Sequence, residues 1–395
     1  MAESGYPLSG LRVIDLTSGV AGPFCTKLMG AMGADVLKVE RPGLGDAARS
    51  LPPFYHDEPG IEKSGLFLYL NTNKWSITLN LEEPAGRAML RRLVATADVV
   101  LEDSKPGTME SWGLGYADLE KINPKVILTS ISGYGQDGPY RDYEHTELVT
   151  AALGGILYIT GEQAREPLKI GGQPMLYFTG LGAWLGTMAA VHYQERTGEG
   201  QHVDISIMDA VGVAQMYSAL SYAYRKENRG RVQDFSPLFQ TKDGWVGMMY
   251  RQQNWEDICN WIGRPDLIDD QKFNNFTGRQ ENMAELNAIV ADWIKDHSKA
   301  DIYHTGQALR MPLGYICEAP DLIESPQYIE REYFVQVDHP ATGPVTYPGM
   351  PIKITGIQWN IKRAPLLGEQ NEEVYCGMLG YTKQDLGVLR AGGII

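Results

Sequence analysis

Short apolar runs alternate with helical patterns over the first 135 residues, and this alternation restricts the possible folds more than any other feature. Parallel strands need long crossover connections, which are usually helices, so strands that alternate with helices predict a parallel α/β sheet. Short apolar runs indicate strands, and apolar residues that recur every three or four positions between these runs indicate helices. We expect strands at 11–16, 35–40, 76–81, 99–102 and 126–131, and helices at 23–32 and 82–97.

The sequence after residue 224 has a different character. A polar stretch at 226–234 is typical of a linker, and three helices follow it, with start patterns at Asn254, Thr277 and Ser298. Another helix is expected at 178–191, and the Pro- and Gly-rich segment 339–351 predicts an extended crossing. A chain of 395 residues is too long for one ordinary core, so we expect about two domains.

The acidic composition argues against nucleic acid or a membrane as a partner. Lys and Arg number 35 against 49 Asp and Glu, which gives a net charge of −14, whereas both of those partners require basic surface. The four cysteines are far apart, and no histidine stands at metal-ligand spacing from another ligand, so no metal is expected. Residues 1–7 form a short polar stretch, which is not typical of a signal peptide. We therefore expect a cytoplasmic protein with reduced, buried thiols.

One glycine motif, GYGQDG at 133–138, matches the spacing of a dinucleotide-binding loop and follows an expected strand. Such a loop must also open a helix, but here Pro139-Tyr140-Arg141 follows and extends the loop. A tight turn is therefore the preferred interpretation.

Several longer motifs occur in a fixed order along nearly the whole chain, from about residue 7 to 375. They are LSGLRVIDLT (8–17), AGPF (21–24), GADVLKVERPG (33–43), NTNKWSI (71–77), RTGEGQHVDIS (196–206), MDA (208–210) and APLLGE (364–369). With these motifs the sequence resembles the class III CoA-transferases, which include formyl-CoA, carnitine-CoA and benzylsuccinate CoA-transferases.

The resemblance implies an α/β fold with a large Rossmann-like domain containing a parallel sheet, a smaller α+β domain, and two protomers interlocked like links of a chain. In this family the chain returns to the large domain at its end. We therefore expect a discontinuous large domain at 1–225 and 331–395 and a small domain at 226–330.

The resemblance also implies the chemistry. A family aspartate attacks the acyl-CoA thioester and forms a mixed anhydride, which then becomes an enzyme-bound CoA thioester. The matching stretch here is PLKIGGQPMLYFTG (167–180), and Leu176 occupies the position of that aspartate. Leucine has no nucleophilic or titratable group. Glu162 and Glu166 lie nearby in sequence, but we expect them to be solvated loop charges, because attack geometry tolerates little displacement.

Other family positions that hold CoA also differ. The family carries Glu-Asn-Phe where this chain has Glu102-Asp103-Ser104, and Trp75 and Ser111 stand where arginines are usual. Arginine binds phosphates in a bidentate manner that neither residue reproduces. The expected CoA-binding residues that remain are Val20, Arg41, Asn73, Lys74 and Lys105. CoA thioester is expected as a substrate, with no covalently bound cofactor.

The leading hypothesis is a non-catalytic subunit that interlocks with a related, aspartate-containing subunit in a hetero-oligomeric CoA-transferase. Benzylsuccinate-type enzymes of anaerobic aromatic degradation have such a pair of subunits, and this chain resembles the subunit without the aspartate. The complex would move CoA from a donor such as succinyl-CoA to a carboxylic acid. Three alternatives remain open: an active homodimer with a displaced carboxylate, an acyl-CoA racemase, which also needs an aspartate, and a non-enzymatic acyl-CoA-binding protein.

Overall fold

The structure is a computed structural model of the chain and describes residues 5–162, 164–228, 230–231 and 237–395. The chain divides into two compact units, Met1–Arg231 with Glu332–Ile395, and Val232–Arg331. Of the linker expected at 226–234, residues 229 and 232–234 lie outside the described residues. The domain boundaries expected at 225/226 and 330/331 stay a prediction.

Six parallel strands form the central sheet of the larger unit, in the order β3-β2-β1-β4-β5-β6. The predicted α/β class with a parallel sheet is confirmed, whereas the interlocked dimer stays a prediction. β3 begins two residues before the expected range, because Lys74 already pairs with Val36 of β2. The strands are β1 (Arg12–Asp15), β2 (Asp35–Glu40), β3 (Lys74–Thr78), β4 (Val99–Glu102), β5 (Ile127–Ser132) and β6 (His202–Ser206).

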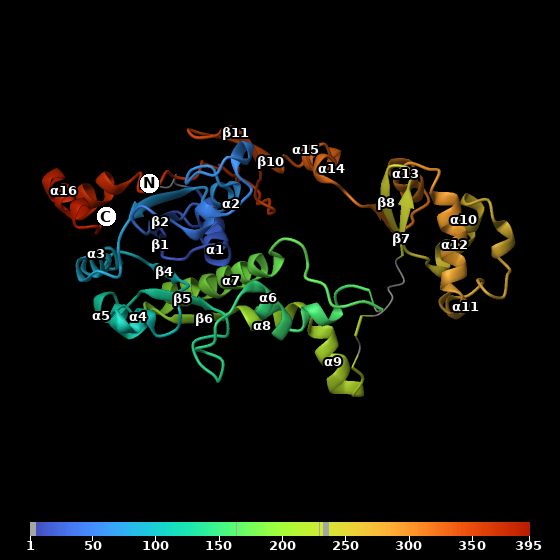
Figure 1. Cartoon of the computed structure of the whole chain (residues 1–395), viewed down its shortest axis with the longest axis horizontal. Coiled ribbons are helices and arrows are strands. Elements are labelled where there is room, and N and C mark those ends of the chain that lie inside the picture. The colour runs from blue at the N-terminus through green and yellow to red at the C-terminus, as the bar shows by residue number, and fades with distance from the viewer. Residues whose placement is uncertain (1–4, 163, 229, 232–236) are drawn as a thin grey trace. The chain divides into compact units, whose positions relative to one another are not determined.

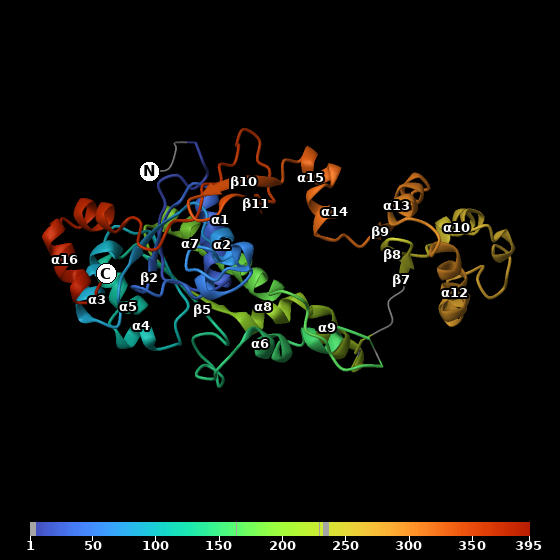
Figure 2. The same cartoon turned by 45° about the horizontal axis from the view of Figure 1, so that its top comes forward.

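Helices cover both faces of this sheet, because its strands are apolar on both sides. Val13 packs toward α1 (Ala21–Ala31), α7 (Pro174–Thr197) and α8 (Ile207–Ala214), whereas its neighbour Ile14 packs toward α3 (Pro84–Val94), α5 (Tyr116–Ile122) and α16 (Lys383–Ala391). Figure 2 shows α16 beside α3, although they lie far apart in the sequence. The other helices of this unit are α2 (Gly65–Leu70), α4 (Thr108–Ser111), α6 (Glu147–Leu153) and α9 (Met216–Arg225), with short 3₁₀ helices η1 (Ala47–Ser50), η2 (Tyr55–Asp57) and η3 (Ile156–Ile159).

Helices α1 and α7 lie against each other (Figure 1) and approach closely at glycine positions. A Cβ atom on Gly180 of α7 would lie 2.5 Å from the backbone oxygen of Ala21, at the start of α1. Residue 180 therefore has no space for a side chain, and this contact fixes the first turns of α7 against the first turn of α1.

The C-terminal part of the larger unit corrects one expectation. Segment 339–351 is not an extended crossing, because all of it up to Pro348 belongs to an antiparallel hairpin of β10 (Phe334–His339) and β11 (Gly343–Pro348). Gly343, with φ of 67°, allows the tight turn between these strands. A π-helical segment, η6 (Glu373–Met378), and α16 complete the unit.

The smaller unit has its own core and combines an antiparallel sheet with helices. The helix expected to start at Thr277 is instead two helices, and Asn275 rather than Thr277 caps the first by accepting a hydrogen bond from Gly278 N. The predicted cap at Ser298 is confirmed. The elements are β7 (Leu238–Thr241), β8 (Gly244–Met248), β9 (Leu313–Tyr315), α10 (Trp255–Trp261), α11 (Phe276–Glu281), α12 (Met283–Ile294), α13 (Lys299–Ala308), α14 (Ala319–Ile323), α15 (Pro326–Glu330), η4 (Gln252–Asn254) and η5 (Pro265–Leu267).

The four cysteines are free thiols, and their burial differs from the expectation. Cys25 and Cys259 are buried, but Cys317 is exposed and Cys376 is half-buried. Among the described residues, none of the helices is both long enough and apolar enough to cross a membrane.

Candidate active site

The strand order reverses between β1 and β4, where ligands commonly bind in open parallel α/β sheets. The carboxyl ends of β1, β2 and β4 carry Asp15, Glu40 and Glu102, and all three side chains are buried. The loop that follows Asp15 leads directly to the first turn of α1. This edge of the sheet is therefore the candidate site.

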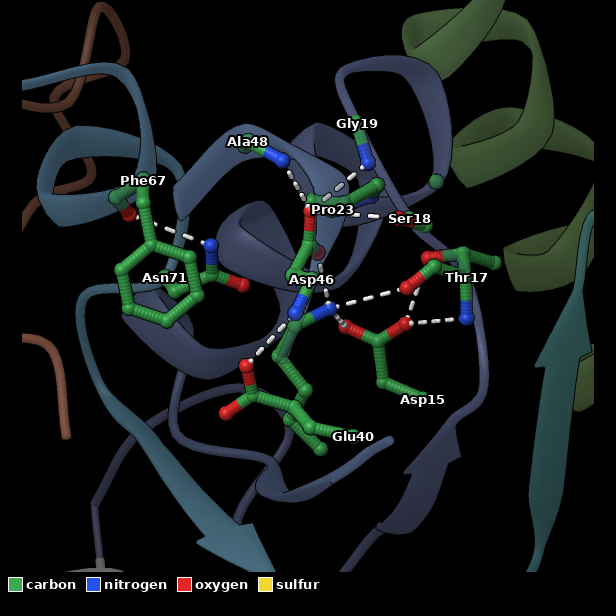
Figure 3. Close-up of polar contacts among 12 residues, drawn as sticks. Asp15, Thr17, Ser18, Gly19, Pro23, Glu40, Asp46, Ala48, Phe67 and Asn71 are labelled. Atoms are coloured by element: carbon green, nitrogen blue, oxygen red, sulfur yellow. Dashed lines mark hydrogen bonds and ion pairs between the residues drawn. The ribbon is translucent and has the colours of Figure 1, made fainter. Parts of the chain in front are cut away.

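Asp15 is the centre of a buried polar network (Figure 3). Its Oδ1 accepts a hydrogen bond from the backbone N–H of Thr17 at 3.0 Å, and its Oδ2 accepts bonds from Thr26 Oγ1 at 2.7 Å and Lys74 Nζ at 3.0 Å. Lys38 Nζ lies 3.7 Å from Oδ2. Both the strand end and the loop after it are thereby fixed to this one carboxylate.

A second carboxylate, Asp46, holds the tip of the same loop. Its Oδ1 accepts hydrogen bonds from the backbone N–H of Gly19 at 2.9 Å and of Ala48 at 2.7 Å, and its Oδ2 pairs with Lys38 Nζ at 2.7 Å. Glu40 extends the network by accepting from the N–H of Asp46 at 2.9 Å and from Arg49 Nε at 2.6 Å. The geometry of this loop thus depends on buried charges from three separate segments.

These charges shift one another's proton affinities. Burial alone raises the pKa of Asp15, but the ammonium groups of Lys38 and Lys74 outweigh it and hold this pKa well below its usual range. Burial lowers the pKa of Lys74 to about 8, although Asp15 opposes this effect. The network therefore keeps Asp15 ionised.

The sequence-predicted CoA-binding residues do not form one group. Val20 is buried as the residue before α1, and Lys74 is buried with its ammonium bound to Asp15, to Pro23 O at 3.0 Å and to Asn71 Oδ1 at 2.8 Å.

The other three residues of that prediction lie elsewhere in the larger unit. Arg41 pairs with Glu82 at 2.6 Å and Lys105 pairs with Glu144 at 2.8 Å, both at the protein surface. Asn73 hydrogen-bonds to the C-terminal segment, where its Nδ2 donates to Asn360 O at 2.8 Å. A CoA-binding role for each of the five residues stays a prediction.

Leu176 lies in the first turn of α7, half-buried at the edge of the apolar core between α1, α7 and the sheet. The next residue, Tyr177, packs edge-on against Phe24 of α1, with 5.0 Å between the ring centroids. Glu166 is 73% exposed and lies 3.9 Å from Arg165 Nη2, and Glu162 is also exposed. Both glutamates are therefore exposed, whereas Leu176 packs against an apolar core.

Sequence reasoning missed the roles of Asp15, Lys38, Asp46 and Asp103. Asp103 follows β4 and accepts a hydrogen bond from Ser18 N at 2.7 Å, and burial raises its pKa well above the usual range. The position of an acidic residue at the end of a predicted parallel strand is the feature that could have identified Asp15 and Asp103.

The glycine motif at 133–138 follows β5 in a loop, and the next helix, α6, begins only at Glu147. Gln136 N in this loop donates to Asp204 Oδ2 at 2.9 Å. The preferred interpretation as a turn is confirmed. Within the described part of the chain, the His, Cys, Asp and Glu side chains form no group that could hold a metal ion.

Comparison with known proteins gives a consistent result. The model of CoA-transferase family III matches residues 8–371. Succinyl-CoA–D-citramalate CoA-transferase and the beta subunit of succinyl-CoA–L-malate CoA-transferase, both from Chloroflexus aurantiacus, are 34% and 33% identical to the chain, and each alignment covers 98% of both sequences. A CAIB/BAIF family protein from Brucella suis has a similar structure, with a TM-score of 0.86 and 29% identity over 94% of this chain and 99% of that one.

The ordered sequence motifs and the six-stranded parallel sheet are consistent with this match over residues 8–371. The chain belongs to CoA-transferase family III.

Proposed function

We propose that this chain is the non-catalytic subunit of a hetero-oligomeric CoA-transferase, in which a related subunit supplies the nucleophilic aspartate. The observation that carries the proposal is Leu176, which lies in the first turn of α7 and which the sequence resemblance aligns with the family aspartate. A hydrocarbon side chain cannot attack a thioester, so the covalent steps belong to the other subunit.

The surroundings of Leu176 support this assignment. Met175 and Leu176 pack at the edge of the apolar core, and Tyr177 contacts Phe24. Together these side chains form an apolar wall where the family mechanism needs an ionised carboxylate. Burying a carboxylate there without a hydrogen-bond partner is costly, so this region suits packing better than nucleophilic catalysis.

Two observations favour a partner subunit. One relative is itself named as a beta subunit of a CoA-transferase. In addition, α8 and α9 expose many apolar side chains. Large contiguous apolar surfaces are typical of protein–protein interfaces. These side chains are Val213, Met216, Tyr217, Leu220, Tyr222 and Tyr224, between 45% and 86% exposed.

Members of this family use CoA thioesters as substrates. We propose that the complex moves CoA from succinyl-CoA to a carboxylic acid acceptor, and that it acts in the cytoplasm. Both Chloroflexus relatives are named for succinyl-CoA as the donor, which supports this half of the reaction. A benzylsuccinate-like acceptor, as in anaerobic aromatic degradation, remains the acceptor proposed from the sequence resemblance.

Purification of the tagged chain from its native host tests the proposal. We expect an aspartate-containing homologue to co-purify in stoichiometric amount, and we expect transfer activity only when both chains are present. A homodimer of this chain with full transfer activity would overturn the proposal.

A covalent-labelling experiment tests the same point on the isolated chain. After incubation with succinyl-CoA and hydroxylamine, mass spectrometry should find no modified carboxylate, whereas a labelled Glu or Asp would show a displaced nucleophile. We also expect Leu176→Asp alone to remain inactive, because the apolar wall and the altered CoA-binding positions persist. Substantial turnover by this variant would show that only the nucleophile is missing.

A further inference from the structure

A cavity of about 440 Å³ opens near the amino ends of β1, β2 and β3, away from the candidate active site. The lining from these strands comes from 12–14, 35–37 and 74–75, whereas Asp15, Glu40 and Thr78 at the carboxyl ends do not line it. The other lining residues are Tyr6, Asn73 and residues from the end of α1 with 33–34, the end of α3 with 96–97, and the segment 360–378. All of these residues belong to the larger unit.

Apolar side chains form one part of the cavity lining, beside polar ones such as Asn73 and Gln370. Ile14, Leu93 and Val374 are buried core residues that form part of its lining. Trp75 also lines the cavity and remains 42% exposed, which is unusual for a tryptophan on a strand. An exposed indole beside a cavity offers a flat surface for the body of a small molecule. A cavity of this volume and composition is typical of small-molecule sites.

Two basic residues of the cavity lining form no ion pair within the described part of the chain. The guanidinium of Arg12 and the ammonium of Lys362 form no ion pair or hydrogen bond with any residue that the structure describes. Both residues are exposed and line the cavity. Four basic residues, Arg12, Lys74, Lys362 and Arg363, line the cavity against two acidic ones, Asp35 and Glu369, whereas the whole chain has a net charge of −14.

Two carboxylates also line the cavity and offset part of this positive charge. Glu369 is held by Arg363, with 2.9 Å between Oε2 and Nη1, and Asp35 lies beside Arg12 in the strand register. The fourth basic residue of the lining, Lys74, directs its ammonium into the Asp15 network instead.

The backbone that carries Lys362 is fixed from the other side of the cavity. Lys362 N donates to Asn73 Oδ1 at 3.0 Å, and Asn73 N donates to Lys362 O at 3.1 Å. The rim cation is therefore attached to a backbone segment that is already ordered, which lowers the entropic cost of binding.

We propose that this cavity is a second ligand site, which binds a small organic anion with an apolar body, such as an aromatic carboxylate. Trp75 and the core residues contact the body, and Arg12 and Lys362 bind the carboxylate. Guanidinium and ammonium groups form charge-assisted hydrogen bonds to carboxylates, and the apolar part of the lining offers contacts to the rest of the molecule. Leu176 does not line this cavity.

Calorimetric titration of the full-length chain with 3-phenylpropionate tests the proposal, with no CoA and no partner subunit present. We expect saturable binding of one molecule per chain, and we expect the uncharged 3-phenylpropanamide to bind at least about tenfold more weakly. The double variant Arg12→Gln/Lys362→Gln should weaken 3-phenylpropionate binding by at least about tenfold, and Trp75→Ala should weaken the binding of both probes.

Two matched variants serve as controls. Lys353→Gln removes another exposed lysine of the C-terminal segment, and Trp245→Ala removes a tryptophan of similar exposure, 46%, in the smaller unit. Neither should change the affinity. Circular dichroism should show unchanged melting of the Arg12→Gln/Lys362→Gln protein, since neither charged group forms an ion pair or hydrogen bond with the described residues.

The proposal is overturned if 3-phenylpropionate does not bind, if it binds as well to the double variant as to the wild type, or if the control variants weaken binding equally. None of these results depends on the identity of the catalytic subunit, so they are separate from a failure of the proposed function.

Discussion

Individual residues at the end of β1 fix the loop before α1 through buried charges. Asp15 contacts two ammonium groups and two threonines, and its side chain has no exposed surface. Removing one member of such a group leaves the others buried without an opposite charge. This lowers the free energy of unfolding by far more than the net contribution of an ion pair. The network should therefore be intolerant of neutral substitutions.

We expect Asp15→Asn to lower the free energy of unfolding by about 3–5 kcal/mol, because Lys74 would lose its buried counterion and Lys38 would keep only Asp46. Urea denaturation monitored by circular dichroism measures this change. Asp118→Asn is a matched control, since Asp118 forms a surface pair with Lys121 at 3.3 Å, and it should change stability by less than about 1 kcal/mol. Equal effects of the two variants would contradict the role assigned to Asp15.

Lys27 gives a pH-dependent prediction at the same scale. Its Nζ donates to Thr72 Oγ1 at 2.8 Å, and burial, followed by the nearby charge of Lys74, lowers its pKa from 10.5 to about 7. Between these two pH values the unfolded chain binds more protons than the folded chain. The contribution of Lys27 to the free energy of unfolding therefore rises as the pH increases from about 7 to about 10.

Lys27→Met should remove this contribution. The gain in stability of the variant over the wild type is expected to be largest near pH 6 and to shrink toward about pH 10. Denaturation curves across this range measure the difference, with Lys121→Met as the control for an exposed lysine. A constant difference at every pH would contradict the prediction.

At the scale of elements, the contact between α1 and α7 places the first turn of α7, including Leu176, beside the candidate site. The contact depends on the absence of a side chain at Gly180, where a Cβ atom would meet Ala21 O at 2.5 Å. Residue 180 follows Leu176 by about one helical turn. Any change that separates the two helices here also moves the apolar wall.

Gly180→Ala should therefore destabilise the chain by about 1–3 kcal/mol, despite the higher helix propensity of alanine. Gly182→Ala on the same helix is the control, because a methyl group at this position would have no neighbouring atom within 4 Å, and the change should stabilise the chain by up to about 1 kcal/mol. Thermal unfolding distinguishes the two, and a stabilising Gly180→Ala would refute the close contact.

Element prediction succeeded where local patterns were sufficient and failed where partners are distant. The strand at 35–40 and the cap at Ser298 were predicted from neighbouring residues alone. The hairpin at 334–348 was missed, because prolines and glycines in 339–351 suggested an unpaired segment, whereas cross-strand pairs such as Val337 with Val345 place it in a sheet.

At the scale of the whole molecule, the proposed hetero-oligomer needs a surface for its partner. Val213 of α8 is 65% exposed beside the other apolar side chains of α8 and α9. We expect Val213→Glu to weaken association with the aspartate-containing subunit by at least about tenfold, because a charge would be buried in an apolar interface.

Val388→Glu on α16 is the matched control, since this valine is 68% exposed on another helix of the same unit. Size-exclusion chromatography with light scattering of the mixed subunits measures both variants. Equal association of Val213→Glu and the wild type would exclude α8 from the interface.

The sequence by itself determined the parallel α/β class, the family and the absence of a carboxylate at residue 176, because these follow from residue types and from spacings along the chain. The tertiary structure decided which charges meet. Lys74 binds Asp15 across 59 positions, and Asn73 binds the segment at Lys362 across 289. The cavity between β1–β3, α3 and segment 360–378 likewise joins residues that no local pattern connects. The physical reason is that local propensities act over a few residues, whereas burial, ion pairing and cavity shape depend on which distant segments pack together.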